Sequence, residues 1–324
     1  MALRIEDPGL HTTVQDLGRP GHYHVGVPLG GAMDSLSHEV ANRLVGNGAS
    51  LATIECTYTG PKFVVTAPTI MAVTGAEMSV SVNGAPVPQW TSVELVAGDT
   101  VASGFTTAGA RTYFAFAGGV DVPIVLGSRS TYTSAEIGGF LGRRLRAGDE
   151  VPLGQRTTPP SHRSLAESLR PTFARSCTAR VVLGPYDHRF TQDSIEMFTT
   201  QQWRLTPVAD RTGFRFDGDE KFEFYPREQP FGAGHDPSNI VDAGYPMGSI
   251  QVPGGGQPIV LHRDAVSAGG YAAIATVISV DLDIIGQLAP KSTVGFEIVS
   301  IDEALAARAT SRRHRDHILA SIPA

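Results

Sequence analysis

Alternating apolar and polar residues predict short β-strands and turns through most of the first 154 residues. The stretch 78–82 alternates strictly and runs into Asn83-Gly84, and residues 85–87 are apolar enough to return as a second strand. Asn-Gly between such stretches favours a two-residue hairpin turn, so a β-hairpin is expected here. Three more strands are expected in similar β-branched stretches bounded by Gly or Pro: residues 51–57, 62–66 and 70–74.

One helix stands out in this half, over residues 34–45. Leu36, Val40 and Leu44 are spaced four apart and therefore fall on one helical face. Asp34 or Ser35 can cap its start, and Gly46-Asn47 can end it.

Residues 94–104 and 144–154 have similar sequences, and in each of them Ala-Gly-Asp separates apolar segments. Gly can supply a positive φ in such a turn, and Asp can bond the nearby backbone. Two similar turns in a β-rich fold account for this sequence similarity, and an internal duplication is not required.

Residues 155–178 are polar and proline-bearing, which predicts a linker. The expected domains are therefore 1–154 and 179–300, followed by a C-terminal helix over 301–324. Expected elements after the linker are a strand at 179–183, a helix at 191–203, a buried strand at 277–280, a short helix from Asp281 to Pro290, a strand at 294–299 and a surface helix at 302–322. The charged run 312–315 is interpreted as a solvated face of that last helix.

Composition narrows the function classes. The 324 residues carry 26 Lys plus Arg against 32 Asp plus Glu, a net charge of -6, and 41% are hydrophobic. No broad basic surface is available for nucleic acid. The two cysteines, Cys56 and Cys177, are far apart in sequence and predict no disulfide framework. No apolar segment is long enough to span a bilayer or resembles a signal peptide, so we expect a soluble, cytoplasmic protein.

Standard chemical motifs are absent from the sequence, including the P-loop and the GxSxG nucleophile elbow. Gly254-Gly-Gly256 leads into Gln257-Pro258 rather than a helix, unlike a dinucleotide-binding loop. His22 and His24 would share one face of a predicted strand, but no third ligand lies nearby in sequence. We therefore expect no metal site.

Two polar clusters remain, the first at residues 7–21 and 30–42, the second at residues 249–258 and 269–271. Both combine glycines with uncharged donors and acceptors, which suits a planar amide or ureido ligand. The same residue types also stabilise turns, so each residue has a purely structural interpretation as well.

These clusters carry a family resemblance. The motifs are Asp7-Pro-Gly, Thr13-Val-Gln-Asp-Leu-Gly-Arg19, Gly31-Ala-Met-Asp34, Ala41-Asn-Arg-Leu-Val-Gly-Asn47, Ala52-Thr-Ile-Glu55, Asp210-Arg-Thr-Gly213, Ser238-Asn-Ile, Asp242, Gly248-Ser-Ile-Gln-Val-Pro253 and Gly269-Gly-Tyr271. In this order they resemble the family called allophanate hydrolase subunit 2, KipA or the 5-oxoprolinase C subunit. The resemblance covers about residues 4–300.

The resemblance implies a mainly β protein with a few helices, built as two cyclophilin-like β-barrel domains. It also implies a subunit of an ATP-dependent complex that opens 5-oxoproline to glutamate. Its partners would be a shorter B subunit, or KipI-like protein, and a third, lactam-handling subunit, with a small amide or lactam as substrate. ATP would be consumed by the complex, and no cofactor would be tightly bound to this chain.

Two alternatives stay open. The chain could be a biotin-dependent carboxyltransferase acting on urea or another amide, in which case carboxybiotin takes part. It could also be a non-catalytic, KipA-like regulatory binding protein. Dependence on a biotinylated carrier and tight partner binding without turnover distinguish these alternatives.

Site residues follow from the motifs. The candidate catalytic residues are Asp16, Arg19 and Asp34, with Arg19 a donor to developing charge and either aspartate a base or an orienting group. The candidate binding residues are Gln15, Ser37, Asn42, Glu55, Ser249, Gln251, Gly269, Gly270 and Tyr271. One departure is Val266-Ser267-Ala268, where the family commonly has Gln and Thr, so polar contacts to the substrate could differ there.

Overall fold

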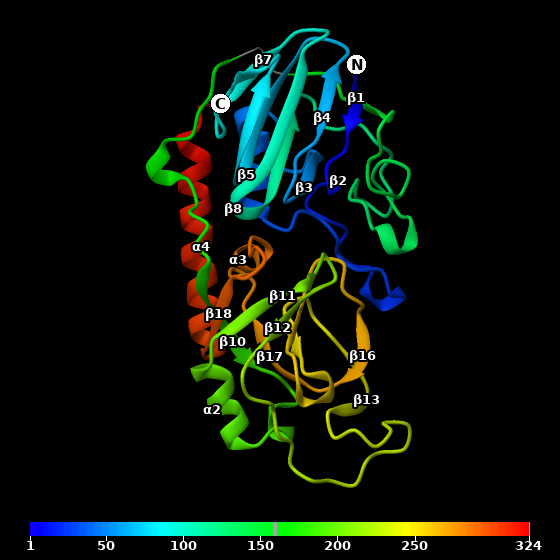
Figure 1. The fold of residues 1–324 in the computed structure, drawn as a ribbon, viewed down its shortest axis with the longest axis vertical. Helices are drawn as coiled ribbons and strands as arrows, with labels where there is room; N and C mark the ends of the chain where they lie inside the picture. Colours follow the sequence, from blue (N-terminus) through cyan, green and yellow to red (C-terminus); the bar gives the residue numbers. More distant parts are fainter. Residues whose placement is uncertain (158–160, 324) are drawn as a thin grey trace. The chain divides into compact units, whose positions relative to one another are not determined.

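The fold is described by a computed structural model that covers residues 1–157 and 161–323. The chain divides into two compact units (Figure 1). The first unit comprises Met1–Arg19, Gly30–Phe173 and the chain from Arg313 onward, and the second comprises Pro20–Leu29 and Ala174–Arg312. The predicted linker 155–178 is divided between the units at residue 173, and its residues 158–160 lie outside the described residues. The expected mainly β class with a few helices and two barrel-like domains is confirmed.

The first unit is built on a curled nine-stranded sheet. Its central path runs β2-β3-β8-β4-β1-β9, and the long strand β5 pairs with β6, β7 and β8. The strands are β1 (Ala2–Asp7), β2 (His11–Gln15), β3 (Thr53–Thr57), β4 (Lys62–Val65), β5 (Thr69–Val82), β6 (Ala85–Pro86), β7 (Ser92–Leu95), β8 (Thr100–Phe116) and β9 (Glu150–Pro152). Short 3-10 turns lie at Thr133–Ala135 and Glu167–Leu169.

The predicted hairpin is confirmed in β5 and β6. Val82 pairs with Ala85, and Asn83 and Gly84 both have positive φ, at 51° and 82°. Two positive φ angles are what a type I′ turn requires, which explains why Asn-Gly stands there. The strands expected at 51–57, 62–66 and 70–74 are also present.

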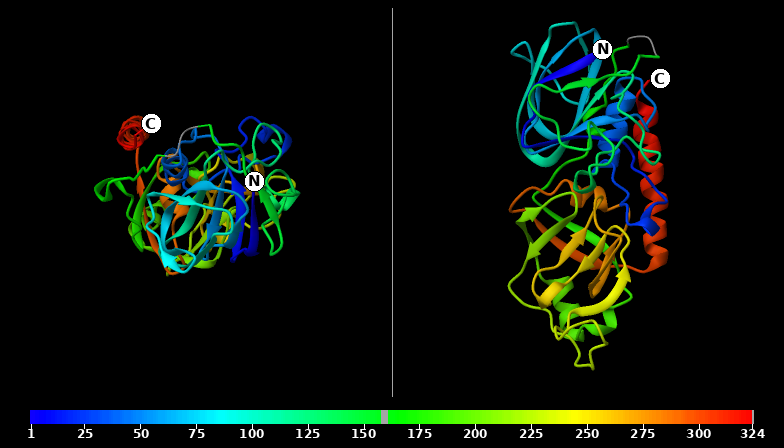
Figure 2. Two further views of the ribbon diagram at one scale, coloured as in Figure 1. Left: turned by 90° about the horizontal axis from the view of Figure 1, so that it is seen from above. Right: turned by 90° about the vertical axis from the view of Figure 1, so that its right-hand side faces the viewer.

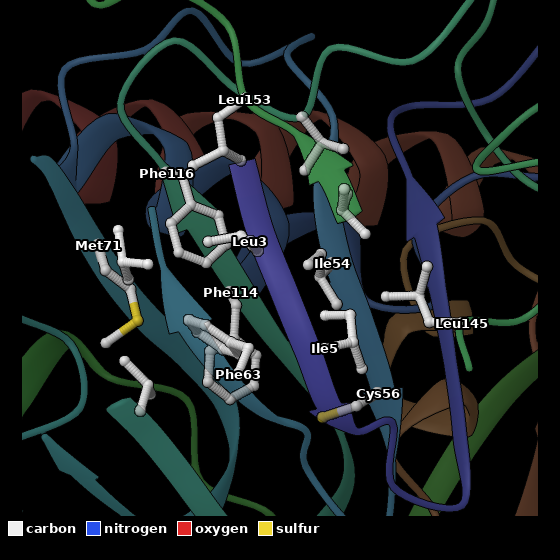
Figure 3. Packing of buried hydrophobic residues seen from close by; sticks show 14 of the residues in the cluster. Leu3, Ile5, Ile54, Cys56, Phe63, Met71, Phe114, Phe116, Leu145 and Leu153 are labelled. Carbon is white, nitrogen blue, oxygen red and sulfur yellow. The ribbon is translucent and has the colours of Figure 1, made fainter. Parts of the chain in front are cut away.

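The concave side of this sheet holds an apolar core (Figure 3). Phe63 of β4 meets Phe114 and Phe116 of β8 edge to face, with ring centroids 6.2 and 5.7 Å apart. Leu3 and Ile5 of β1 are buried in the same cluster. Edge-to-face rings and alternating strand residues pack this side of the sheet.

Helix α1 (Ser35–Leu44) covers the other side of the sheet and packs on β5 and β8 (Figure 2). Asp34 caps its N-terminus, as predicted, by accepting the backbone N–H of Ser37. The apolar face of α1 shares a second core with the last turn of helix α4 (Ile301–Ser321), where Ile318 is buried.

The interpretation of residues 312–315 as a solvated face is wrong for Arg315. Its guanidinium pairs with Glu39 at 2.8 Å and donates to Ser35 Oγ at 2.7 Å. Sequence periodicity alone could not place this arginine beside α1, because the two helices are far apart in the chain.

The second unit contains a closed barrel of seven strands in the order β10-β17-β14-β15-β12-β11-β18. Its strands are β10 (Ser176–Leu183), β11 (Trp203–Ala209), β12 (Gly213–Asp217), β14 (Ser249–Gln251), β15 (Ile259–Leu261), β17 (Ala273–Val277) and β18 (Thr293–Ile298). Strands β13 (Asn239–Gly244) and β16 (Ala268–Tyr271) form a separate ribbon. Closure leaves the barrel with no unpaired edge.

Helices α2 (Gln192–Thr200) and α3 (Leu282–Gly286) lie wholly within the second unit, which also contains α4 up to Arg312 and the 3-10 turns at Tyr23–Val25, Asp187–Arg189 and Pro253–Gly255. The core stacks aromatic rings: Trp203 on Phe222 with centroids 5.3 Å apart, and Phe198 on Phe296 at 4.7 Å. These rings hold α2 against β18.

Three predictions in this unit need correction. The helix expected over 191–203 ends earlier, since Trp203 already begins β11. The strand expected at 277–280 ends at Val277, and Asp281 after it accepts hydrogen bonds from Arg180 at 2.8 and 2.7 Å. His22 and His24 do not lie on a strand: His24 is in the 3-10 turn Tyr23–Val25, and His22 directly precedes that turn.

The remaining predictions concern a disulfide, a metal site and a membrane-spanning segment. Cys56 and Cys177 are both free thiols, as expected. Within residues 1–157 and 161–323 there is no group of three or more His, Cys, Asp or Glu that could hold a metal ion. No helix in the described part of the chain has the length and apolar character needed to cross a membrane.

Candidate functional site

Asp16 follows β2 and anchors a loop of the first unit. Its Oδ1 accepts hydrogen bonds from Gly18 N–H, Ser128 Oγ and Ser130 Oγ at 2.8, 2.6 and 2.5 Å. Its Oδ2 accepts the backbone N–H of Arg129 at 2.6 Å. The carboxylate is only 7% exposed, and four donors hold it in one orientation. Such a carboxylate positions the loop, and using it as a base would break these bonds.

Arg19 depends on the same loop. Its side chain is buried, and Nη2 donates to the carbonyl oxygen of Ser130. Asp16 therefore orients Arg19 indirectly, through Ser130. Gln15 is fully buried beside them, and its Nε2 donates to Thr13 Oγ1 at 3.0 Å and to the Thr131 carbonyl at 3.2 Å.

Glu55, Tyr113 and Asp34 form a second network of the first unit. Glu55 Oε2 accepts the Tyr113 hydroxyl at 2.8 Å and the Met33 backbone N–H at 2.8 Å. The same hydroxyl accepts the Asp34 N–H at 2.8 Å. Burial raises the pKa of Tyr113 well above its ordinary value, and the nearby charges of Glu55 and Asp34 raise it further. The phenol therefore stays protonated and donates to Glu55.

Asp34 and Ser37 lie at the start of α1. Asp34 Oδ2 accepts the Ser37 hydroxyl at 2.6 Å, in addition to the backbone cap. Asn42 lies near the other end of α1, where Nδ2 donates to the Leu51 carbonyl at 2.8 Å and Oδ1 accepts from Asn47 Nδ2 at 2.9 Å. Asn42 therefore ties the loop after the helix to the helix itself.

The second cluster is centred on Tyr245, a residue that the motifs left out. Its buried hydroxyl lies 2.7 Å from the Gly269 carbonyl oxygen and 2.5 Å from that of Tyr271, and it accepts the Tyr271 N–H at 2.8 Å. Gln251 also bonds this hydroxyl through its side chain. Burial raises the pKa of Tyr245 above its ordinary value. A side chain added at Gly269 would collide with the Tyr245 ring, which explains the glycine there.

The remaining predicted residues of this cluster have simpler settings. Ser249 Oγ donates to the Pro246 carbonyl at 2.8 Å and stabilises a turn. Gly270 is half-buried on β16. Tyr271 leaves 42% of its surface exposed.

The structure thus brings the predicted residues together in two groups, one in each unit. Gln15 ends β2, and Asp16 and Arg19 lie in the loop that follows it in the first unit, whereas Asp34, Ser37 and Glu55 share one network. Gln251, Gly269 and Tyr271 meet at Tyr245 in the second unit. Sequence reasoning missed Tyr113, Tyr245 and the serines of the 128–130 loop. Tyr245 had a signal, since it lies between the motif residues Asp242 and Gly248.

Comparison with known proteins identifies the family. Residues 25–298 match the model for the carboxyltransferase domain, subdomain A and B. The chain belongs to this family. Urea amidolyase of Saccharomyces cerevisiae is 34% identical over 312 residues, which is 94% of this chain but 17% of that protein. The chain therefore spans about one sixth of the length of that curated relative.

A second kind of relative matches end to end. The C subunit of Escherichia coli 5-oxoprolinase is 32% identical over 322 residues, covering 98% of this chain and 97% of that protein. Among solved structures, the urea carboxylase of Kluyveromyces lactis superposes with a TM-score of 0.91 at 34% identity, covering 98% of this chain and 29% of that one.

Proposed function

We propose that this chain is a subunit of an ATP-dependent complex that opens 5-oxoproline to glutamate. The observation that supports it best is the match to the C subunit of 5-oxoprolinase, which runs over nearly the whole length of both proteins. Its partners in this proposal are a shorter B subunit, or KipI-like protein, and a third, lactam-handling subunit. A cytoplasmic location is part of the proposal.

Opening the lactam ring requires donor groups that bind the negative charge developing on the lactam carbonyl. In the proposed complex ATP phosphorylates this carbonyl oxygen and leaves as ADP; water then attacks the carbonyl carbon, the ring C–N bond breaks, and phosphate is released. Arg19 is suited to the role of donor because Ser130, and Asp16 behind it, hold its guanidinium in place. Asp16 acts in this proposal as a positioning residue, since its carboxylate oxygens already accept four hydrogen bonds.

Asp34 and Ser37 have a different part in the proposal. Asp34 caps α1 and bonds Ser37, so it fixes the start of the helix beside the Glu55–Tyr113 pair. Gln15 and Gln251 remain proposed amide-binding residues, each within its own unit.

The test is product formation by the purified subunits together. Glutamate formed from 5-oxoproline only in the presence of ATP supports the proposal. Arg19→Ala should lower turnover at least tenfold, which is about 1.4 kcal/mol of transition-state stabilisation. The matched control is Arg204→Ala, which removes an exposed arginine from β11 and should leave turnover unchanged. A smaller loss for Arg19→Ala removes this residue from a central role.

Carboxyl transfer is the second candidate, favoured by the family model and by the close superposition on urea carboxylase. Gln251 and the backbone of Gly269 and Gly270 are uncharged donors and acceptors, which fit a ureido ring in type. Carboxybiotin would supply the carboxyl group. Urea-dependent consumption of carboxyl groups from a biotinylated carrier, without any glutamate from 5-oxoproline, would establish this function instead.

A further inference from the structure

Tyr245 ties the β13–β16 ribbon to the barrel of the second unit. It lies between β13 and β14 in the chain and is 3% exposed. Its hydroxyl lies 2.7 Å from the Gly269 carbonyl oxygen and 2.5 Å from the Tyr271 carbonyl oxygen, and it accepts the Tyr271 N–H at 2.8 Å. All three backbone groups belong to β16, so a side chain rather than a further strand satisfies this part of the ribbon.

The same hydroxyl fixes the carboxamide of Gln251 on β14. A phenol hydroxyl has one proton to donate and two positions that accept. The proton goes to one of the two carbonyl oxygens, and the Tyr271 N–H takes one accepting position. The side-chain bond with Gln251 therefore takes the other accepting position, and Gln251 donates it through Nε2.

Two observations agree with this orientation of the carboxamide. A methyl group added at Gly269 would lie 2.9 Å from Cε2 of the Tyr245 ring and 3.8 Å from Gln251 Nε2, so the carboxamide nitrogen lies close to the ring. Burial raises the pKa of Tyr245, and the bonds from Tyr271 and Gln251 act in the opposite direction, as groups that donate to a phenol oxygen do.

This orientation leaves the carboxamide oxygen of Gln251 for a ligand. Oε1 accepts no hydrogen bond from residues 1–157 or 161–323, yet it is not among the buried atoms that lack a partner, so this oxygen reaches solvent. The neighbouring strand is also open, since Gly269 and Gly270 are half-buried and 42% of Tyr271 is exposed. A small ligand can therefore approach Gln251 along β16.

We propose that Tyr245 is a positioning residue that fixes this orientation of Gln251, so that Oε1 accepts the N–H of a lactam ring. The proposal rests on the proposed function, because 5-oxoproline supplies that N–H. A carboxamide that turned freely would present either its oxygen or its NH2 group, and it would not distinguish a ring N–H from a ring oxygen. Held by Tyr245, Gln251 selects the lactam, because a ring oxygen would face Oε1 with no proton between them.

Ligand-observed NMR titration of the full chain tests this selection without requiring turnover. The two ligands are 5-oxoproline and the γ-lactone of 2-hydroxyglutarate, which has the same ring and carboxylate but an oxygen in place of the N–H. We expect the wild type to bind 5-oxoproline saturably and to bind the lactone about tenfold more weakly or worse.

Tyr245→Phe keeps the ring and removes the hydroxyl that holds the carboxamide. The preference for 5-oxoproline over the lactone should fall to about twofold or less, because Gln251 can then turn its NH2 group toward the ring oxygen. Tyr225→Phe is the matched control: it removes the hydroxyl of an exposed tyrosine in the same unit and should keep the wild-type preference. A purely structural role of Tyr245 would weaken both ligands equally and leave their ratio unchanged.

Gly269→Ala is a second variant, which decides the question if Tyr245→Phe does not fold. It keeps every polar group, but its methyl group displaces the Tyr245 ring from the position that bonds Gln251. The preference for the lactam should again fall severalfold. The thermal unfolding midpoint of each variant shows that it is folded.

The proposal is overturned by equal binding of the two ligands to the wild type, by no saturable binding of 5-oxoproline, or by folded variants that lose affinity but keep the wild-type preference. The proposed function fails separately. If the preference depends on Tyr245 but the assembled subunits form no glutamate, the orientation of Gln251 stands and the 5-oxoprolinase function does not.

Discussion

The buried charge of Asp16 in the first unit is compensated by close hydrogen bonds, whereas the buried charge of Arg263 in the second unit is compensated only weakly. Asp16 accepts four hydrogen bonds from its own protein, three of them through one oxygen. Arg263 has an unpartnered Nε and an acidic neighbour at 3.7 Å. A saturated group stabilises the fold and positions its neighbours, whereas a weakly compensated buried charge adds little to stability. The difference separates buried charges that stabilise the fold from one that contributes little.

The largest expected effect comes from the saturated arginine of the second unit. Arg211→Met leaves Asp264 buried without its partner and should lower the free energy of unfolding by about 3–5 kcal/mol. Arg263→Met is the matched change at the neighbouring turn. It should lower the free energy of unfolding far less, because it breaks no close ion pair. Urea unfolding followed by circular dichroism measures both. Equal losses of unfolding free energy in the two variants would contradict the difference described here between the two arginines.

Asp16→Asn tests the saturated loop of the first unit. The amide keeps one acceptor oxygen and turns an NH2 group toward donors, so the unfolding free energy should fall by about 1.5–3 kcal/mol. Turnover should fall as well, since Ser130 and Arg19 lose their support. Asp7→Asn is the control, because that exposed carboxylate accepts the nearby Gly9 N–H and should tolerate the change. A stable but inactive Asp16→Asn would instead indicate a direct catalytic role.

Two tyrosines, the buried Tyr113 and the half-buried Tyr23, provide a second comparison with a smaller expected effect. Tyr113→Phe removes a hydroxyl that bridges Glu55 and the Asp34 N–H, and should cost about 1–3 kcal/mol. Tyr23→Phe removes a hydroxyl with no partner and should be neutral for stability. Thermal unfolding of both variants is the measurement. A destabilised Tyr23→Phe would show that its hydroxyl already has an acceptor within the protein.

The smallest effect concerns pH and the partly exposed Arg143–Asp149 pair. The hydrogen bond from Arg143 is the main cause that holds the pKa of Asp149 below its ordinary value of 3.8. The stabilisation is therefore complete above the unfolded pKa and is lost as the pH falls through the folded pKa. It amounts to about 0.2–1 kcal/mol. Unfolding curves from about pH 2 to 6 should show this loss for the wild type, and Asp149→Asn should lack that component. An unchanged acid limb in Asp149→Asn would exclude this pair as its source.

Local patterns predicted much of the fold. Asn83-Gly84 indicated the hairpin, and Asp34 with Leu36, Val40 and Leu44 indicated helix α1 and its cap, because these signals depend on neighbours in sequence. Sequence did not reveal that Arg315 pairs with Glu39 or that Asp281 accepts the backbone N–H of Arg180. Both depend on contacts between residues far apart in the chain, which no periodicity records.

The candidate site shows the same division. The motifs located Asp16, Arg19 and Gln251, but which of their acceptors and donors are already occupied depends on the 128–130 loop and on Tyr245. The pairing of Asp264 was also invisible in the sequence, where Arg263 is its neighbour. In the folded chain Asp264 binds Arg211 instead.

The most direct test of the proposed 5-oxoprolinase role is an add-back titration. The shorter partner and the lactam-handling subunit are mixed with 5-oxoproline and ATP, this chain is added in increasing amounts, and glutamate is measured. We predict no glutamate without the chain and a rate that rises to a plateau at a fixed subunit ratio. Glutamate formation that is independent of the chain, or absent at every ratio although all three proteins are folded, would contradict the account.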